Sequence, residues 1–374
     1  MQLTGTGRAL VAAAVVLTVA GVALGQPGTV GLGVAGLLVT LVAALTVAEA
    51  PKVEVDRAVR PHEVDRGKPA EVSLAFRGTA PRARPFSVVE TVGGERRSAA
   101  MPALRAGERA SIAYELDTTR RGTIVAGPLQ LRRTDPLGLV VAERRIAGTA
   151  SVQVRPRRHP IAMLPSGRWR DLEGPTREVS RGTATFHQLR DYVPGDDMRH
   201  IHWRATARTG DLIVREHVDT TKPEVVVIVD NRERALGEDD FEEGVDVAAS
   251  VLTAAERAGF PTRLLFADGR EERDEGLDQL AHLDRLTAVR RSPVASLQQL
   301  ADALRARGRS LVFVTGELDP QDLRLLAKIA HGFAPAILVS VQADRRAPFV
   351  APPGVVGIPC ASAGGFVAAW GQHR

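Results

Sequence analysis

Residues 9–48 contain no charged side chain, and this run limits what the 374-residue chain can fold into more than any other feature. One membrane-spanning helix takes about 20 apolar residues, so the run is long enough for two. Gly and Pro at positions 25–28 interrupt it and favour a turn. The pattern therefore predicts a hairpin of two transmembrane helices, at about 9–24 and about 29–48, packed closely through Gly31, Gly33 and Gly36.

The charges around this run predict its orientation. Arg8 precedes the predicted helices, Lys52 and Arg57 follow them, and the connection between them carries no charge. By the positive-inside rule both ends of the hairpin lie in the cytoplasm. We therefore expect a multi-pass protein of the cell (plasma) membrane with cytoplasmic soluble domains. Two alternatives are a cleaved signal peptide followed by one anchor, for which a cleavage site is lacking, and an envelope protein with its domains outside the cell.

Residues 51–155 have the pattern of a small all-β domain. Their apolar and polar residues alternate at period two, with Gly and Pro between the runs. The six runs are VEVDRAV, AEVSLAF, FSVVETV, ASIAYEL, GTIVAGPLQLRR and LGLVVAERRI. Short strands separated by turns predict an immunoglobulin-like β-sandwich. The single cysteine, Cys360, leaves no pair for an intramolecular disulfide, and a spacer or an interaction surface near the membrane is the simplest role.

Residues 156–222 form a connector and a distinctive central segment, and residues 223–374 alternate between strand and helix patterns. Strands are predicted at 225–230, 262–266, 311–315, 336–341 and 355–358, and helices at about 277–288, at about 296–307, and after caps at Asp239 and Asp319. The alternation predicts a doubly wound parallel α/β sheet. In such sheets ligands bind beyond the carboxyl ends of the strands.

The segment 181–217 concentrates aromatic, acidic, basic and imidazole side chains in an otherwise plain sequence. Phe186, Leu189, Tyr192 and Val193 predict an apolar face that Ile201 and Trp203 extend. A Pro-Gly turn then leads to paired acids among arginines, where bidentate carboxylate–guanidinium pairing is expected. The candidate interaction residues are Arg190, Tyr192, Pro194, Gly195, Asp196, Asp197, Arg199, His202, Trp203 and Arg208.

Three interpretations of this segment compete. His200 and His202 would share one side of a strand and, with Asp196 or Asp197, could bind a metal ion. The same residues could serve a metal-dependent hydrolase or nuclease. We favour a rigid ion-pair lattice that presents a docking surface, because paired acids beside arginines usually neutralise one another. The net charge of +5 is spread along the chain, so no nucleic-acid partner is expected.

The predicted sheet resembles a von Willebrand factor A domain, whose first strand ends in an Asp-x-Ser-x-Ser metal-ion-dependent adhesion site. Asp230 occupies the acidic position, but Arg232 and Arg234 occupy the two serine positions. Guanidinium groups are permanent cations that donate hydrogen bonds, so they repel Mg²⁺ where hydroxyl oxygens would bind it. We therefore expect a degenerate site at Asp230, Arg232, Arg234 and Thr315 that binds no metal, with Asp230 forming an ion pair or capping a loop.

The motif Arg190-x-Tyr192-x-Pro194-Gly195-Asp196-Asp197-x-Arg199-x-Ile201-x-Trp203 resembles the signature of the bacterial family known as domain of unknown function 58. Thr185 departs from the family pattern, which more often has an acid there. The resemblance implies the same domain layout, and a partnership with MoxR-type AAA+ ATPases and sometimes with transglutaminase-like membrane proteins. With no P-loop and no nucleophile constellation in the sequence, we expect a membrane-anchored scaffold or adaptor that is not an enzyme and needs no cofactor.

Overall fold

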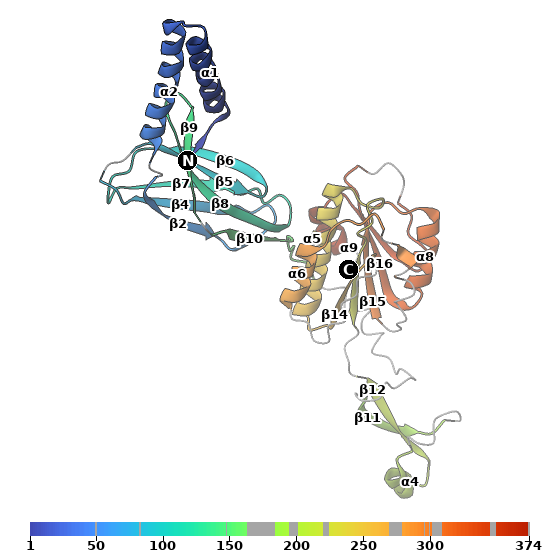
Figure 1. Cartoon of the computed structure of the whole chain (residues 1–374). Helices are drawn as coiled ribbons and strands as arrows, with labels where there is room; N and C mark the ends of the chain where they lie inside the picture. The colour runs from blue at the N-terminus through green and yellow to red at the C-terminus, as the bar shows by residue number, and fades with distance from the viewer. Residues whose placement is uncertain are drawn as a thin grey trace. The chain divides into compact units, whose positions relative to one another are not determined.

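The computed structural model divides into two compact units, Met1–Arg155 and Pro156–Arg374, whose elements are labelled in Figure 1. The structure describes residues 1–48, 51–81, 84–146, 148–162, 184–193, 201–219, 224–268, 279–294, 296–298, 300, 309–344 and 349–372.

Two helices, α1 (Gly5–Ala23) and α2 (Pro27–Val47), form the expected hairpin and lie side by side in Figure 1. Both are long and apolar enough to cross a membrane. A Cβ atom on Gly33 would lie 2.6 Å from the carbonyl oxygen of Ala14, and Gly36 also faces Ala14. Gly31 has open space around it, so its predicted packing role is wrong, because two residues along a helix turn the side chain by about 200°.

The start of α1 differs from the prediction. Thr4 is the N-cap, and its hydroxyl accepts a hydrogen bond from the amide of Gly7. Arg8 was expected before the helix but lies within its first turns. The strand β1 (Gln2–Leu3), which the sequence did not indicate, pairs with β9 (Val140–Ile146) and ties the start of the hairpin to the β-domain.

Two sheets make up the rest of the first unit. The smaller sheet has the antiparallel order β2-β4-β7, comprising Val53–Arg60, Glu71–Gly78 and Arg109–Glu115. The larger sheet is built on the long strand β8 (Gly122–Thr134), which pairs with β9, β10 and β5. Its other strands are β3 (Glu63–Asp65), β5 (Phe86–Val92), β6 (Glu95–Met101) and β10 (Ala150–Arg155).

Both sheets contribute side chains to one hydrophobic core. Leu74 and Phe76 project into it from β4, and Leu129 and Leu131 from β8. In each pair the residue between them lies outside this core, because successive side chains along a strand point to opposite faces. The period-two runs predicted as strands do form strands. β4 and β5 each have one buried face, whereas β7 has no fully buried residue and the buried residues of β9 are consecutive.

The second unit contains a five-stranded parallel sheet with the order β14-β13-β15-β16-β17. Its strands are β13 (Val225–Val229), β14 (Thr262–Phe266), β15 (Arg309–Thr315), β16 (Phe333–Val341) and β17 (Val356–Cys360). β13 is buried throughout, as its unbroken apolar sequence predicts for a strand covered on both faces.

Helices cover both faces of this sheet. The helices α5 (Glu238–Arg257), α6 (Gln279–Ala288) and α9 (Ala363–Gln372) share a core with one face, and α8 (Pro320–Ala330) shares a core with the other. Residues 156–162 run along the second unit: the amides of Arg157 and His159 donate to Asp246 and Ser250 of α5. The expected doubly wound α/β arrangement is present.

One predicted helix cap is wrong. Gly237 is the N-cap of α5 and makes no side-chain cap hydrogen bond, whereas Asp239 lies inside the first turn. There its negative charge interacts favourably with the positive amino end of the helix dipole. Asp319 does cap α8, and its Oδ1 accepts from the amides of Gln321 and Asp322, with Pro320 at the first helical position.

Candidate functional site

The strand order places the candidate site between β13 and β15. The chain passes from β13 to β14 on one side of it and then crosses to β15 on the other side. The crevice between β13 and β15 is therefore the topological switch point. Val229 pairs with Val314 in register. The next residues, Asp230 and Thr315, therefore lie side by side at the carboxyl edge, as the sequence predicted.

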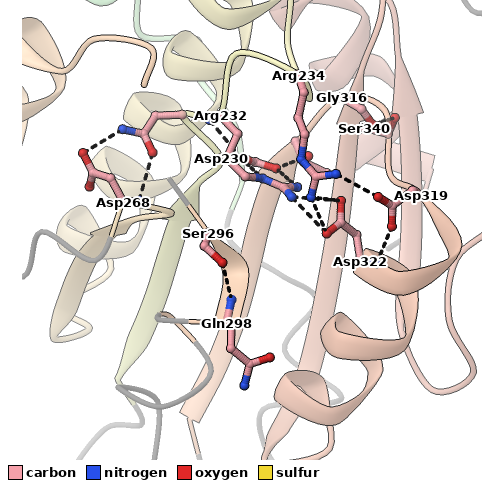
Figure 2. Close-up of polar contacts among 12 residues, drawn as sticks. Asp230, Arg232, Arg234, Asp268, Ser296, Gln298, Gly316, Asp319, Asp322 and Ser340 are labelled. Carbon is pink, nitrogen blue, oxygen red and sulfur yellow. Dashed lines mark hydrogen bonds and ion pairs between the residues drawn. The ribbon is translucent and has the colours of Figure 1, made fainter. Parts of the chain in front are cut away.

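Asp230 is fully buried and is neutralised by Arg232. The Nε and Nη2 atoms of Arg232 donate to Oδ1 and Oδ2 of Asp230 at 2.8 and 2.7 Å, and the hydroxyl of Thr315 donates to Oδ2 at 2.7 Å. Figure 2 shows the guanidinium lying against the carboxylate. The predicted ion pair at Asp230 is confirmed.

The third member of this cluster is Asp322, in the first turn of α8. Arg232 Nη1 donates to both of its carboxylate oxygens at 2.9 Å, and Arg232 is only 1% exposed. Burial alone would lower the pKa of Arg232, but hydrogen bonds and charge from Asp230 and then Asp322 outweigh it and raise that pKa. The guanidinium therefore stays charged and bridges β13 to α8.

Arg234 forms an outer layer on the same helix end. Its Nη2 donates to both oxygens of Asp322 at 3.0 and 3.1 Å, and its Nη1 donates to Asp319 at 2.8 Å. The amide of Asp322, with help from Arg234, lowers the pKa of Asp319. Unlike Arg232, Arg234 has a side chain that is 61% exposed, so this layer is screened by water.

A second polar link joins β13 to β14. The side-chain amide of Asn231 donates to Asp268 at 3.0 Å, and the amide of Asp268 donates back to Asn231 Oδ1 at 3.2 Å. Asn231 is fully buried. The ends of β13 and β14 are thus joined by reciprocal contacts, and Figure 2 draws the hydrogen bonds of Asp268 beside the Arg232 cluster.

A cavity of about 710 Å³ opens next to Arg234. Its polar lining is largely acidic, with Asp239, Asp240 and Glu317. The backbone at Gly316 passes very close to its neighbours, since a Cβ atom there would lie 2.1 Å from the carbonyl oxygen of Ala235. Within the described ranges, no group of three or more His, Cys, Asp or Glu side chains has the geometry of a metal site.

The central segment folds as a separate hairpin. The strands β11 (Ala184–Asp191) and β12 (Ile213–Asp219) pair antiparallel, with helix α4 (Trp203–Thr209) between them. The amide of Tyr192 donates to the carbonyl oxygen of Leu212 at 2.8 Å. Pro194, Gly195, Asp196, Asp197, Arg199 and His200 lie outside the described residues, as do the side chains of Phe186, Leu189 and Arg190.

His202 is the N-cap of α4, and its Nδ1 accepts the amide of Ala205 at 3.0 Å. A metal ion needs one ring nitrogen with a free lone pair; in a neutral imidazole whose Nδ1 accepts this hydrogen bond, Nε2 carries the proton, so the contact competes with metal binding. Ile201 is buried, but Trp203 is 68% exposed and Val193 is also exposed. The predicted common apolar face is therefore wrong for these residues, because Ile201 is bridged to Val214 whereas Trp203 begins the helix α4.

The exposed face of α4 carries Trp203, Arg204, Ala207 and Arg208. We call these four residues the α4 surface. They lie on one side because residues four apart on a helix are neighbours, and the first turn of α4 contains no acidic residue. Trp203 and Arg208 are among the candidate interaction residues from the sequence, and Arg204 is not.

Two acidic residues at this sheet edge were not predicted from the sequence: Asp322, which binds Arg232, and Asp268, which binds Asn231. Asp322 follows the recognisable Asp319-Pro320 helix start by three residues, so the signal for it was present. Placing it beside Arg232 requires knowing that α8 begins at the same sheet edge where β13 ends. The interaction becomes visible only with the strand order.

Comparisons with known proteins agree with the signature. Residues 188–355 match the family model described as protein of unknown function DUF58. The uncharacterized protein YeaD of Bacillus subtilis (strain 168) is 24% identical over 239 residues, which is 61% of this chain and 58% of the relative. The chain thus spans under two thirds of the length of that relative.

Solved structures give weaker likenesses. The CARDB domain of the PF1109 protein from Pyrococcus furiosus matches with a TM-score of 0.22 at 16% identity, over 28% of this chain and 94% of that domain. The alkylpurine DNA glycosylase AlkC of Pseudomonas fluorescens matches with a TM-score of 0.22 at 20% identity, over 35% of this chain and 40% of AlkC. Scores this low carry no argument about fold or function. The family model does carry an argument: residues 188–355, somewhat under half of the chain, are similar to the DUF58 family of proteins of unknown function.

Proposed function

We propose that the protein is a membrane-anchored, non-catalytic scaffold or adaptor that works with a MoxR-type AAA+ ATPase in the assembly or maturation of a membrane or envelope complex. The observation that carries the proposal is the buried guanidinium of Arg232, which occupies the sheet edge where a ligand or metal would bind. The partner comes from the family resemblance, which also makes a transglutaminase-like membrane protein a candidate component.

The contacts of Arg232 argue against a reactive edge. General acid–base and metal chemistry both require side chains that can exchange a proton or a ligand with the substrate. Both oxygens of Asp230, and both of Asp322, already accept from guanidinium groups. A von Willebrand factor A-like sheet with this substitution, and an immunoglobulin-like sandwich on the membrane side, are the finer fold assignments that we propose.

The membrane part of the proposal rests on α1 and α2. Their lengths correspond to about 28 and about 31 Å at 1.5 Å per residue, against a hydrocarbon layer of about 30 Å. With both helix ends on the cytoplasmic side by the positive-inside rule, the second unit lies in the cytoplasm. Added protease should then leave the second unit intact in whole cells and cleave it in inside-out vesicles; cleavage in whole cells would contradict this orientation.

The α4 surface is the docking site that we propose for the ATPase. An exposed Trp beside two Arg residues has the composition of an interface hot spot, and single Trp contacts of this kind contribute about 2 kcal/mol or more to binding. The two positive charges favour an acidic partner face. Binding should therefore weaken as the salt concentration rises.

The test uses full-length protein in detergent and the purified MoxR-type ATPase of the same cell. Trp203→Ala should weaken binding about 30-fold. Arg208→Glu should also weaken binding, and its effect should be larger at low salt than at high salt. Val294→Ala is the matched control, because Val294 is 83% exposed and lies outside the segment 184–219. Equal affinities for the Trp203 variant, the control and the unmodified protein would reject docking at α4.

A further inference from the structure

The turn between β8 and β9, residues 135–139, is held in a fixed shape by one carboxylate. Oδ1 of Asp135 accepts the amide of Val140 at 2.6 Å, and Oδ2 accepts the amide of Leu137 at 2.8 Å. The amide of Gly138, with φ of +70°, donates to the carbonyl oxygen of Asp135. Asp135 is buried, so the turn keeps its geometry without help from water.

This turn is fastened to the start of α1. The amide of Thr4 donates to the carbonyl oxygen of Leu139 at 2.9 Å, and the hydroxyl of Thr4 donates to that of Gly138 at 2.6 Å. Gly7 allows this approach, because a Cβ atom there would lie 2.1 Å from the carbonyl oxygen of Leu139. The carbonyl oxygens of Gly138 and Leu139 thus accept hydrogen bonds from Thr4, which lowers the cost of placing this part of the turn near a membrane.

The turn also packs beside apolar residues inside both helices. Leu139 and Val140 form a small core with Ala43, and Leu10 and Ala44 pack against it. Leu10 lies about 7 Å along α1 from its first residue, and Ala43 about 6 Å from the end of α2. Since the helices are only about as long as the hydrocarbon layer is thick, these levels lie at or within its boundary if the helices span it.

One side chain of the turn points away from this small core. Leu137 is 64% exposed, whereas Leu139 is 5% exposed. Arg8, on α1 between Gly7 and Leu10, is exposed, and Arg84 donates to the carbonyl oxygen of Thr46 near the end of α2. Arginines with long stems mark the level of lipid headgroups at helix ends. Leu137 is therefore an apolar side chain held out at that level.

We propose that the 135–139 turn is a third membrane contact, with Leu137 inserted among the lipids at the boundary of headgroups and acyl chains. The inference rests on the proposed membrane anchoring by α1 and α2. In this arrangement the β-domain itself contacts the bilayer, which fixes the orientation of the domain against the membrane surface.

The test places an environment-sensitive fluorophore on single cysteines in the full chain with the background change Cys360→Ala. The protein is reconstituted in vesicles of phosphatidylethanolamine and phosphatidylglycerol. The probe positions are Leu137→Cys, Leu17→Cys in the middle of α1, and Glu95→Cys. Glu95 pairs with Val92, which pairs with Ala126 on β8, so it lies about 27 Å along β8 from Thr134.

The proposal expects the Leu137 probe to emit to the blue of the Glu95 probe, to be quenched by lipids spin-labelled near the headgroup, and to resist aqueous iodide. If the Leu137 probe behaves like the Glu95 probe while the Leu17 probe is quenched by lipid, the third contact is wrong and the anchoring stands. If the Leu137 probe resists both quenchers, protein covers it and the proposal fails. If iodide quenches the Leu17 probe, the anchoring fails, and the third contact fails with it.

Discussion

Replacing Arg232 by methionine should destabilise the parallel sheet far more than the same change at Arg234. Methionine keeps most of the buried volume of Arg232 and removes its charge. Asp322 then still pairs with Arg234. Asp230 retains only the hydroxyl of Thr315 and a backbone amide, so one carboxylate is left buried without a cation.

The size of the effect follows from the burial. Breaking a buried ion pair by removing one partner costs about 3–5 kcal/mol, whereas removing an exposed partner costs about 1 kcal/mol or less. Arg232 is 1% exposed and the Arg234 side chain is 61% exposed, although both bind Asp322. A factor of ten in an equilibrium constant corresponds to about 1.36 kcal/mol. The equilibrium constant for opening of the sheet should therefore rise about 100-fold to 10,000-fold for Arg232→Met and less than about 10-fold for Arg234→Met.

Native-state hydrogen exchange of the full chain in detergent measures this opening at the amides of β13 and β15, which are buried ladder positions. Combining Arg232→Met with Asp230→Asn should recover part of the loss, because it removes the unpaired charge. Similar protection in the two single Arg variants would show that burial of the guanidinium does not set its contribution, and would refute the reasoning.

Two further predictions concern the cluster and the β-domain. Arg232→Ser combined with Arg234→Ser should create saturable Mg²⁺ binding by calorimetry, since hydroxyl oxygens then join Asp230; adding Asp230→Asn should abolish it, and no binding in the double variant would contradict the site. Burial, and then the 2.5 Å hydrogen bond to Glu90, raise the pKa of Tyr114. The unfolded tyrosine ionises near pH 10, so stability should fall above about pH 10 more steeply in the unmodified protein than in Tyr114→Phe; equal slopes in chemical denaturation would count against this.

The strands that could be predicted are those whose burial leaves a mark on the sequence. β13 is covered on both faces and appears as an unbroken apolar run, and β4 and β5 have one buried face and alternate. β6 has the sequence ERRSAAM and buries only its last residue. Its place in the sheet comes from pairing with β5, a long-range contact that local periodicity does not record.

The candidate site was predictable in the same uneven way. Asp230 and Arg232 are two residues apart, so their pairing follows from local geometry. Asp322 is 90 residues away from Arg232, and nothing between them indicates the contact. At Trp203 local reasoning failed, since neighbouring apolar residues suggested one face, but the cap at His202 ends the strand pairing and begins a helix.

The arginine at position 232 limits what the sheet edge can do. Arg232 makes four side-chain hydrogen bonds to two carboxylates, and bonds to charged groups contribute about 1.5–3 kcal/mol each when both partners are present. A divalent ion entering between Asp230 and Asp322 would have to break these bonds and move a buried cation into the remaining space. We infer that these contacts hold β13 and α8 together. Under the proposed scaffold role, binding of a partner then uses side chains presented elsewhere, such as the exposed indole of Trp203.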